Sequence, residues 1–434
     1  MVWTNVQHIL THGMASNLVA DWVDCIELKT SRCLYLRGTM KLASRIIHAG
    51  RDKKWAGYSV NVPVVRASTV VFDSMAQMQH ATAHRAQQVP YYGRRGTQTH
   101  FAFSDAICAL EGGAGCALYP SGAAAISGAL LSFLQAGDHL LMVDTVYEPT
   151  RALCDQLLKG YGIETTYYDP LIGDGIAALI QANTKVIFLE SPGSLTMEVM
   201  DVPRIAAIAH QHDIVVMLDN TWASPILCQP FAMGVDISIQ AATKYIVGHS
   251  DVMLGIASAT STHWPRLREH SYLMGYCASA DDVYLAARGL RTLGVRLAQH
   301  EKNALIVARW LVQQPEVVHV RHPALADCPG HAEFVRDFSG SNGLFSFVLQ
   351  PASVAAVTAM VDGMALFKMG FSWGGFESLI VVNSNLQRIR SATRWPYTGP
   401  LVRLHIGLED VDDLIADLAA GLARYRAFLS AEVR

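Results

Sequence analysis

Short apolar runs alternate with helix-forming segments from about residue 101 to residue 280, and this rhythm constrains the fold more than any other feature of the sequence. The apolar runs predict strands at residues 116–119, 139–143, 185–189 and 214–218, with helix-forming segments between them. A repeated strand–helix–strand order is typical of a parallel sheet with helices on both faces. We therefore predict an α/β fold whose large domain, residues 101–290, contains a mostly parallel sheet.

The rhythm changes after about residue 290, where the helices become longer and the strands are more widely spaced. Helices are predicted at residues 297–313 and 411–429, and strands at 317–321, 344–349 and 401–406. This order predicts a smaller C-terminal α+β domain, residues 291–434.

The N-terminal part of the chain lacks long periodic segments. Residues 1–39 mix basic and acidic side chains and have no compact apolar core of the signal-peptide kind. We expect this extension to be disordered or absent from the native protein, with translation starting at Met40. Residues 40–100 predict an N-terminal arm outside the large sheet.

Composition excludes several classes of protein. The chain has 434 residues, of which 51% are hydrophobic and 16% charged, which fits a well-buried enzyme. A net charge of −3 predicts no strong attraction to nucleic acid or to anionic membranes, and no apolar run reaches the length of a spanning helix. The eight cysteines form no CxxC pair and no zinc spacing, so we expect reduced thiols, no metal and a cytoplasmic location.

A lysine and an aspartate each follow an apolar run in the predicted sheet. Asp219 closes the run 214–218, and Lys244 follows the apolar and small residues 237–242. Both side chains would face the crevice at the carboxyl ends of the strands, where open α/β folds bind ligands. Pyridoxal phosphate (PLP) needs an amine for its aldehyde and a carboxylate for its pyridinium nitrogen. Alone, Lys244 reads more often as an ordinary surface lysine.

Other segments suit the same ligand, each with a simpler alternative. Gly122 and Ala123 open a predicted helix, whose N-terminus favours a phosphate, although tight packing explains small residues equally well. Thr243 lies beside Lys244, and Tyr147 follows a strand and could stack on a ring. Arg94 and Arg95 form a cationic loop tip between glycines, which suits a phosphate or a carboxylate. The simpler alternative is an ordinary solvated loop.

Several motifs together resemble the bacterial cystathionine β-lyases, which belong to the Cys/Met-metabolism group of fold-type I PLP enzymes. The resemblance extends from about residue 41 to residue 424. It is carried by YGRRGTQTHF, LEGGAGC, SGAAA, YEPT, ESPGSLTMEV, DNTWASP, IQAATKYIVGHSD, RGLRTLGVRL, FSWGGFES and LVRLHIGLEDVDDLIADL. The motifs ESPGSLTMEV and IQAATKY favour the β-lyase branch over the γ-synthases and γ-lyases.

The resemblance implies roles for the cofactor-binding residues. Lys244 is similar to the lysine that holds the PLP aldehyde and Asp219 to the pyridinium partner. Tyr147 resembles the stacking tyrosine that also orients the reacting amine. Gly122, Ala123 and Thr243 resemble the phosphate cradle within one subunit. In this family, residues similar to Tyr92 and Arg94 complete the phosphate site of the neighbouring subunit, which implies an arm-sharing dimer and usually a tetramer.

The resemblance also implies a substrate site. Arg403 is similar to the arginine that binds the substrate α-carboxylate, and Ser372 and Trp373 resemble residues of the site wall. Tyr92 is expected beside the substrate, and Arg95 near the distal end of cystathionine. Trp373, Arg95 and Tyr272 could instead serve packing. The chain departs from the family pattern at Phe371, where a tyrosine is common, and at Ala152, near an often polar position; both bear on substrate preference.

The implied reaction is β-elimination of L-cystathionine to L-homocysteine, pyruvate and ammonia, a step toward methionine, with side activity on L-cysteine and cysteine S-conjugates. Lys244 would remove the Cα proton and return a proton to the leaving sulfur. Two alternatives stay open, a γ-lyase or γ-synthase acting at Cγ and a non-catalytic regulatory protein on the same fold. A dinucleotide-binding oxidoreductase is excluded because no GxGxxG follows a strand with an acid downstream.

Overall fold

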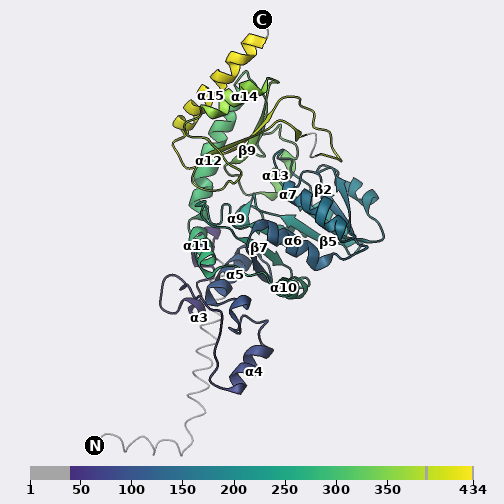
Figure 1. The fold of residues 1–434 in the computed structure, drawn as a ribbon, viewed down its shortest axis with the longest axis vertical. Coiled ribbons are helices and arrows are strands. Elements are labelled where there is room, and N and C mark those ends of the chain that lie inside the picture. The colour runs from purple at the N-terminus through teal and green to yellow at the C-terminus, as the bar shows by residue number, and fades with distance from the viewer. Residues whose placement is uncertain (1–39, 387–389, 433–434) are drawn as a thin grey trace, which may run out of the picture.

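The computed structural model describes residues 40–386 and 390–432. The predicted extension, residues 1–39, lies outside the described residues. Two sheets are stacked along the long axis of the molecule, with the α3 and α4 region at one end and α15 at the other (Figure 1).

The larger sheet has seven strands in the order β1-β7-β6-β5-β4-β2-β3. Its strands are β1 (Gly115–Tyr119), β2 (His139–Val143), β3 (Glu164–Tyr168), β4 (Thr184–Glu190), β5 (Val215–Asp219), β6 (Ile237–Ala241) and β7 (Gly255–Ala259). The strands β3, β2, β4, β5 and β6 pair in parallel, whereas β7 is antiparallel to both β1 and β6. The prediction of an α/β fold with a mostly parallel sheet is confirmed.

Helices cover this sheet because its central strands are apolar on both faces. Every residue from Val186 to Leu189 of β4 is fully buried, as are Val216 and Met217 of β5. A continuous apolar run of this kind is typical of parallel strands that are covered on both sides. Helix α6 packs over β6 and β7, α8 packs against β5, and α10 packs against β1.

Helices lie between and around the strands of this sheet, as the alternation of the sequence predicted. They are α5 (Gln98–Glu111), α6 (Gly122–Phe133), α7 (Glu148–Ala152), the π-helix η2 (Leu153–Leu158), the 3₁₀ helix η3 (Gly173–Leu179), α8 (Val202–His210), α9 (Ser224–Leu227), the 3₁₀ helix η4 (Pro230–Met233), α10 (Trp264–Leu273) and α11 (Ala280–Leu290). The start of α6 is fixed by Ser121, whose side chain accepts a hydrogen bond from the backbone N–H of Ala124.

The second sheet has five strands in the order β10-β11-β12-β9-β8. These are β8 (Val317–Arg321), β9 (Leu344–Leu349), β10 (Lys368–Met369), β11 (Leu379–Asn383) and β12 (Leu401–His405), and the helices around them are α12 (Leu293–Val312), α13 (His331–Asp337), α14 (Val354–Asp362) and α15 (Val411–Glu432). The predicted apolar face of α15 is buried at Leu414, Leu418, Leu422 and Tyr425. The domain boundaries at residues 101 and 291 stay a prediction.

Residues 40–97 contain only short helices. These are α2 (Leu42–His48), α3 (Lys53–Ala56), α4 (Met75–Ala83) and the 3₁₀ helix η1 (Gly93–Arg95). Apolar side chains along this segment, including Tyr58, Val60, Val71 and Met75, are exposed. Exposed apolar side chains on an extended segment are typical of a surface that another chain covers, so the prediction of an arm toward a neighbouring subunit is retained as a proposal.

Candidate active site

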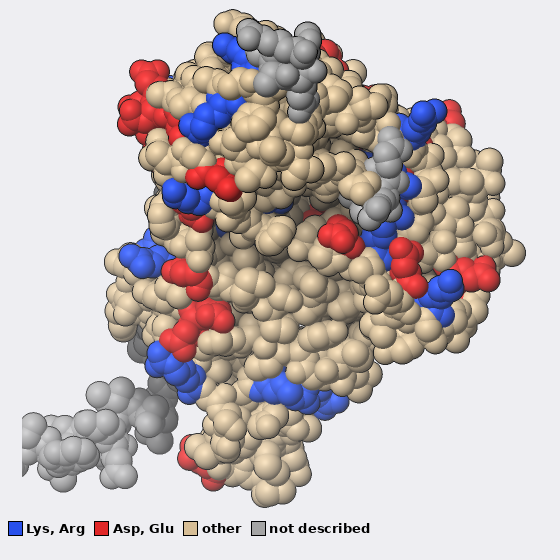
Figure 2. All heavy atoms as spheres, turned by 45° about the horizontal axis from the view of Figure 1, so that its top comes forward, with Lys and Arg blue, Asp and Glu red and all other residues tan. Residues whose placement is uncertain are grey.

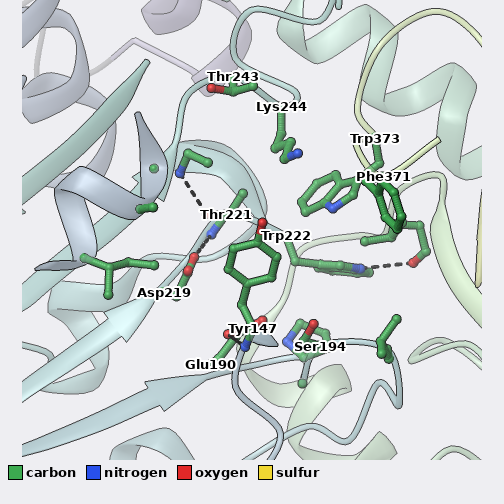
Figure 3. A pocket seen from close by; sticks show the side chains of 18 of the residues that line it. Tyr147, Glu190, Ser194, Asp219, Thr221, Trp222, Thr243, Lys244, Phe371 and Trp373 are labelled. Carbon is green, nitrogen blue, oxygen red and sulfur yellow. Dashed lines mark hydrogen bonds between the residues drawn. The ribbon is translucent and has the colours of Figure 1, made fainter. Parts of the chain in front are cut away.

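A cavity of about 210 Å³ lies beyond the carboxyl ends of β4, β5 and β6, where it is also bounded by residues of the second sheet. Lys244 and the ring of Tyr147 point into it from opposite sides, with Asp219 on one flank and Trp373 and Phe371 on the other (Figure 3). The carboxyl edge of a parallel sheet is the place where open α/β folds bind ligands.

Lys244 lies in the turn that follows β6, and its ammonium is held between two walls of the cavity. Nζ donates a hydrogen bond to Ser372 Oγ at 2.8 Å and lies 5.3 Å from the centre of the Trp373 ring. Burial and, to a smaller extent, the positive charge of Arg403 lower the Lys244 pKa to about 8, against the opposing effect of the negative charge of Asp219. The amine is therefore neutral in a larger share of molecules than an exposed lysine would be.

Asp219 is the last residue of β5 and is 8% exposed. Its Oδ1 accepts a hydrogen bond from the backbone N–H of Thr221 at 2.9 Å. Burial raises the Asp219 pKa, while the hydrogen bonds from Thr221 and the positive charge of Lys244 oppose this shift. A buried carboxylate without an ion pair to a lysine or arginine, within the described part of the chain, suits a cationic ring nitrogen.

Tyr147 stands at the start of α7 with its ring in the cavity (Figure 3). Its backbone N–H donates a hydrogen bond to Glu190 Oε2 at 2.8 Å. Burial raises the pKa of the Tyr147 hydroxyl, and the positive charge of Arg403 opposes this shift. The hydroxyl is therefore protonated near neutral pH.

The N-terminus of α6 opens onto the same cavity through Gly122 and Ala123. Gly122 lies so close to β6 that a Cβ at this position would come within 2.6 Å of Ala241 Cβ. The backbone N–H groups of a first helical turn have no partner within the helix and favour an anion. Thr243 Oγ1 accepts from Leu254 N at 2.9 Å and lies 3.2 Å from Leu254 O, which fixes it beside this helix end.

Arg403 comes from β12 of the second sheet and reaches the cavity from that side. Its Nη2 lies 3.2–3.3 Å from the backbone carbonyls of Gly370, Phe371 and Ser372. Burial lowers the Arg403 pKa to about 10, so the guanidinium stays charged near neutral pH. A half-buried guanidinium is suited to bind a carboxylate through two hydrogen bonds.

The structure does not bring Tyr92, Arg94 and Arg95 to this cavity. Arg94 Nη1 donates to the backbone oxygen of Tyr272 at 2.6 Å, and the Arg95 guanidinium lies 4.3 Å from the centre of the Tyr272 ring. Both arginines line a separate cavity of about 300 Å³, and Tyr92 is 45% exposed. Tyr272 packs against Arg95 in the same chain, and a role toward a neighbouring subunit stays a prediction.

The family follows from comparison with known proteins. The model of the Cys/Met metabolism PLP-dependent enzymes matches residues 43–423. The chain belongs to this family. A cystathionine beta-lyase of Haemophilus influenzae is 53% identical over 388 residues, which cover 88% of this chain and 98% of that protein. The cystathionine beta-lyase MetC of Escherichia coli is 51% identical over 389 residues, with the same coverage.

A solved structure has the same fold. The crystal structure of cystathionine gamma-lyase from Lactobacillus plantarum complexed with L-serine matches with a TM-score of 0.80 at 29% identity, and the match covers 89% of this chain and 100% of that one. As a member of the family, the chain is a PLP-dependent enzyme that acts on an amino acid.

The residues around the cavity fit PLP. A partly neutral amine, a buried carboxylate, a tyrosine ring and a helix N-terminus face one space, and they correspond to the aldehyde, the ring nitrogen, the ring face and the phosphate of the cofactor. The close approach of Gly122 to β6 leaves the start of α6 open to a phosphate, because no side chain covers it there.

Sequence reasoning gave no role to Glu190 and Thr221, although both line the cavity. Thr221 holds Asp219 through its backbone N–H, and its Oγ1 accepts from Ala241 N at 2.8 Å. Glu190 ends β4 as Asp219 ends β5. A carboxylate directly after an apolar run therefore occurs twice in the sequence, and this pattern could have indicated that Glu190 lines the cavity.

We also searched the described residues for a metal site, a membrane-spanning helix and a charged surface. No group of three or more metal-binding side chains occurs among them, and none of their helices is long and apolar enough to cross a membrane. Lys and Arg side chains are interspersed with Asp and Glu on the face drawn in Figure 2, without an extended field of one sign. A mixed surface attracts polyanions weakly.

Proposed function

We propose that this protein catalyses the β-elimination of L-cystathionine, which releases L-homocysteine, pyruvate and ammonia. Identities of 51–53% to proteins named cystathionine beta-lyase, over 88% of the chain, support this reaction. The single observation that carries the chemistry is the position of Lys244, a half-buried amine with a pKa of about 8 at the carboxyl edge of the sheet, opposite Tyr147 and beside Asp219.

Bound PLP supplies an electron sink for the pair of electrons released at the substrate Cα. Lys244 Nζ removes the Cα proton, because about a tenth of the molecules carry a neutral amine at pH 7 when the pKa is about 8. The Cβ–S bond then breaks, and Lys244 returns the proton to the leaving sulfur. Ser372 Oγ holds Nζ at 2.8 Å and directs the amine between these positions. One water molecule hydrolyses the remaining three-carbon unsaturated amino acid to pyruvate and ammonia.

The remaining residues bind and orient. Asp219 carries the negative charge that faces a cationic ring nitrogen, and Tyr147 presents its ring and hydroxyl to the cavity. Arg403 binds the substrate α-carboxylate, exchanging its contacts with backbone carbonyls for a bidentate charged pair. Trp373 and Phe371 form the wall on the opposite flank. L-Cysteine and cysteine S-conjugates meet the same requirement, an α-amino acid with sulfur at Cβ.

The working enzyme is a homo-oligomer in the cytoplasm, in which Tyr92, Arg94 and Arg95 act on the site of a neighbouring subunit. The exposed apolar side chains of residues 57–78 support this arrangement, as does the fact that Arg94 lines a cavity other than the one that contains Lys244.

A γ-lyase is the second candidate, because a cystathionine gamma-lyase has the same fold at a TM-score of 0.80. Product analysis separates the two reactions. Purified protein with PLP and L-cystathionine is expected to release pyruvate and homocysteine in equal amounts. Release of 2-oxobutyrate and cysteine would favour the γ-lyase, and turnover of neither kind would favour a non-catalytic regulatory protein.

A further inference from the structure

Glu190 stands beside Asp219 at the edge of the sheet. The two residues end the neighbouring parallel strands β4 and β5 and are register partners. Neighbouring strands lie about 4.8 Å apart, and register partners point to the same face. Both side chains line the active-site cavity. Two carboxyl groups therefore lie side by side at the place where only one is needed to face a ring nitrogen.

The surroundings of the two carboxyl groups differ. Asp219 accepts hydrogen bonds from Thr221 and faces the positive charge of Lys244. Glu190 Oε2 accepts one hydrogen bond, from the backbone N–H of Tyr147 at 2.8 Å. Among residues 40–386 and 390–432, no lysine or arginine forms an ion pair with Glu190.

Two negative charges at this spacing repel each other, so one of the two carboxyl groups keeps a proton. Burial and the charge of Asp219 raise the Glu190 pKa well above its usual value, while the N–H of Tyr147 and the more distant charge of Arg390 oppose the shift. Arg390 is itself paired with Glu198 at 3.9 Å. The proton therefore resides on Glu190, and Asp219 carries the charge.

We propose that Glu190 is a positioning residue that works uncharged, anchoring the main chain of Tyr147 while leaving Asp219 as the only anion beside the cofactor ring. The neutral carboxyl ties the start of α7 to the end of β4, so the stacking ring and the pyridinium partner keep a fixed relation. This proposal rests on PLP occupying the cavity and goes beyond the elimination reaction itself.

The test compares two substitutions of nearly equal size in the holoenzyme. Glu190→Gln keeps an acceptor for the Tyr147 N–H and is permanently neutral, so it should match the wild type within about twofold in kcat/KM at pH 7. Glu190→Met removes the acceptor and should lower kcat/KM by roughly five- to tenfold, the value of one lost hydrogen bond. The visible absorption and circular dichroism of bound PLP should be unchanged in the first variant and altered in the second.

A pH titration of the bound cofactor's absorption extends the test. The groups that face Glu190 or its neighbours are Asp219, Tyr147, Lys244, Arg390 and Arg403. Glu190→Gln should follow the wild type wherever wild-type Glu190 keeps its proton, and depart from it only above the raised pKa of Glu190.

Two results would overturn the proposal. A loss of more than tenfold in Glu190→Gln at pH 7, with a shifted cofactor band, would mean that the residue works as an anion. Wild-type behaviour of Glu190→Met would mean that its contact with Tyr147 positions nothing. Thermal unfolding of the PLP-loaded variants identifies a variant that fails to fold, in which case Glu190→Leu replaces Glu190→Met. The spectra of bound PLP do not depend on which substrate is turned over, so they test the Glu190 role even if L-cystathionine is not the substrate.

Discussion

At the scale of single residues, the environment of Lys244 decides its chemistry. The sequence predicted this amine and its carboxylate Asp219, because each follows an apolar run long enough to be recognised as a buried strand. It could not predict the contact with Ser372, which lies 128 positions away in the loop between β10 and β11. Nor did the sequence indicate how far Arg403 and burial together lower the pKa, because both effects depend on packing.

This environment gives a pH dependence for cofactor capture. The neutral amine attacks the PLP aldehyde, and a lowered pKa means that the neutral fraction rises as the pH rises through about 8. The rate at which PLP-free protein develops its visible band after mixing with PLP should therefore increase from pH 6, reach half its maximum near pH 8, and level above it. Stopped-flow absorbance measures this rate.

The matched control for this experiment is Lys185→Ala, which removes an exposed lysine of β4 and should leave the profile unchanged. A midpoint near the ordinary lysine pKa of about 10.4 would show that the amine is not perturbed.

At the scale of elements, strands with continuous runs of large apolar residues were predictable, whereas β3 and β7 were not. The runs in β4 and β5 are continuous and apolar. In β7 (Gly255–Ala259) every residue except Ile256 is small, and β3 has two threonines and only one fully buried residue. Small side chains give no periodic signal. In β7 they are needed because Gly255 packs against the backbone of Ser121, where a Cβ would come within 2.0 Å.

The start of α6 depends on a similar close approach. Gly122→Ala should push this helix end away from β6, because the new Cβ would lie 2.6 Å from Ala241 Cβ. Displacing the N–H groups from a phosphate should weaken PLP binding about tenfold, which is comparable to the loss of one charge-assisted hydrogen bond. Equilibrium titration with PLP, followed by absorbance, measures the affinity.

Gly160→Ala is the control for this substitution, since a Cβ there meets no atom within 4 Å. Equal PLP affinity in the two variants would contradict the proposal that the start of α6 holds the phosphate.

At the scale of the whole molecule, the cavity joins residues of both sheets, and Arg403 lies 159 positions after Lys244. The sequence predicted the fold class. It also predicted residues at the ends of strands, and the structure places these residues around one cavity. Tyr92 and Arg94 were predicted to act on a neighbouring subunit, and in this chain Arg94 lines another cavity together with Arg95. A neighbour's contribution depends on how copies associate, which strand and helix patterns do not encode.

If each active site contains residues from two subunits, two inactive variants should restore activity to each other. Arg94→Ala removes the residue given to the neighbour, and Lys244→Ala removes the amine of the chain's own site. Random reassociation of the two should give about half mixed dimers with one intact site each, hence roughly a quarter of wild-type activity. Pyruvate release after unfolding and refolding the mixture measures the recovery. Recovery no greater than the sum of the separate variants would show that each chain forms its site alone.

The central claim is that Lys244 holds PLP, and chemical reduction of the holoenzyme tests it most directly. Borohydride should fix the cofactor covalently to the amine, and peptide mass spectrometry should then find the pyridoxyl phosphate mass on the peptide that contains Lys244. The variant Lys244→Ala should bear no such mass. Attachment to a different lysine, or to none, would contradict the account.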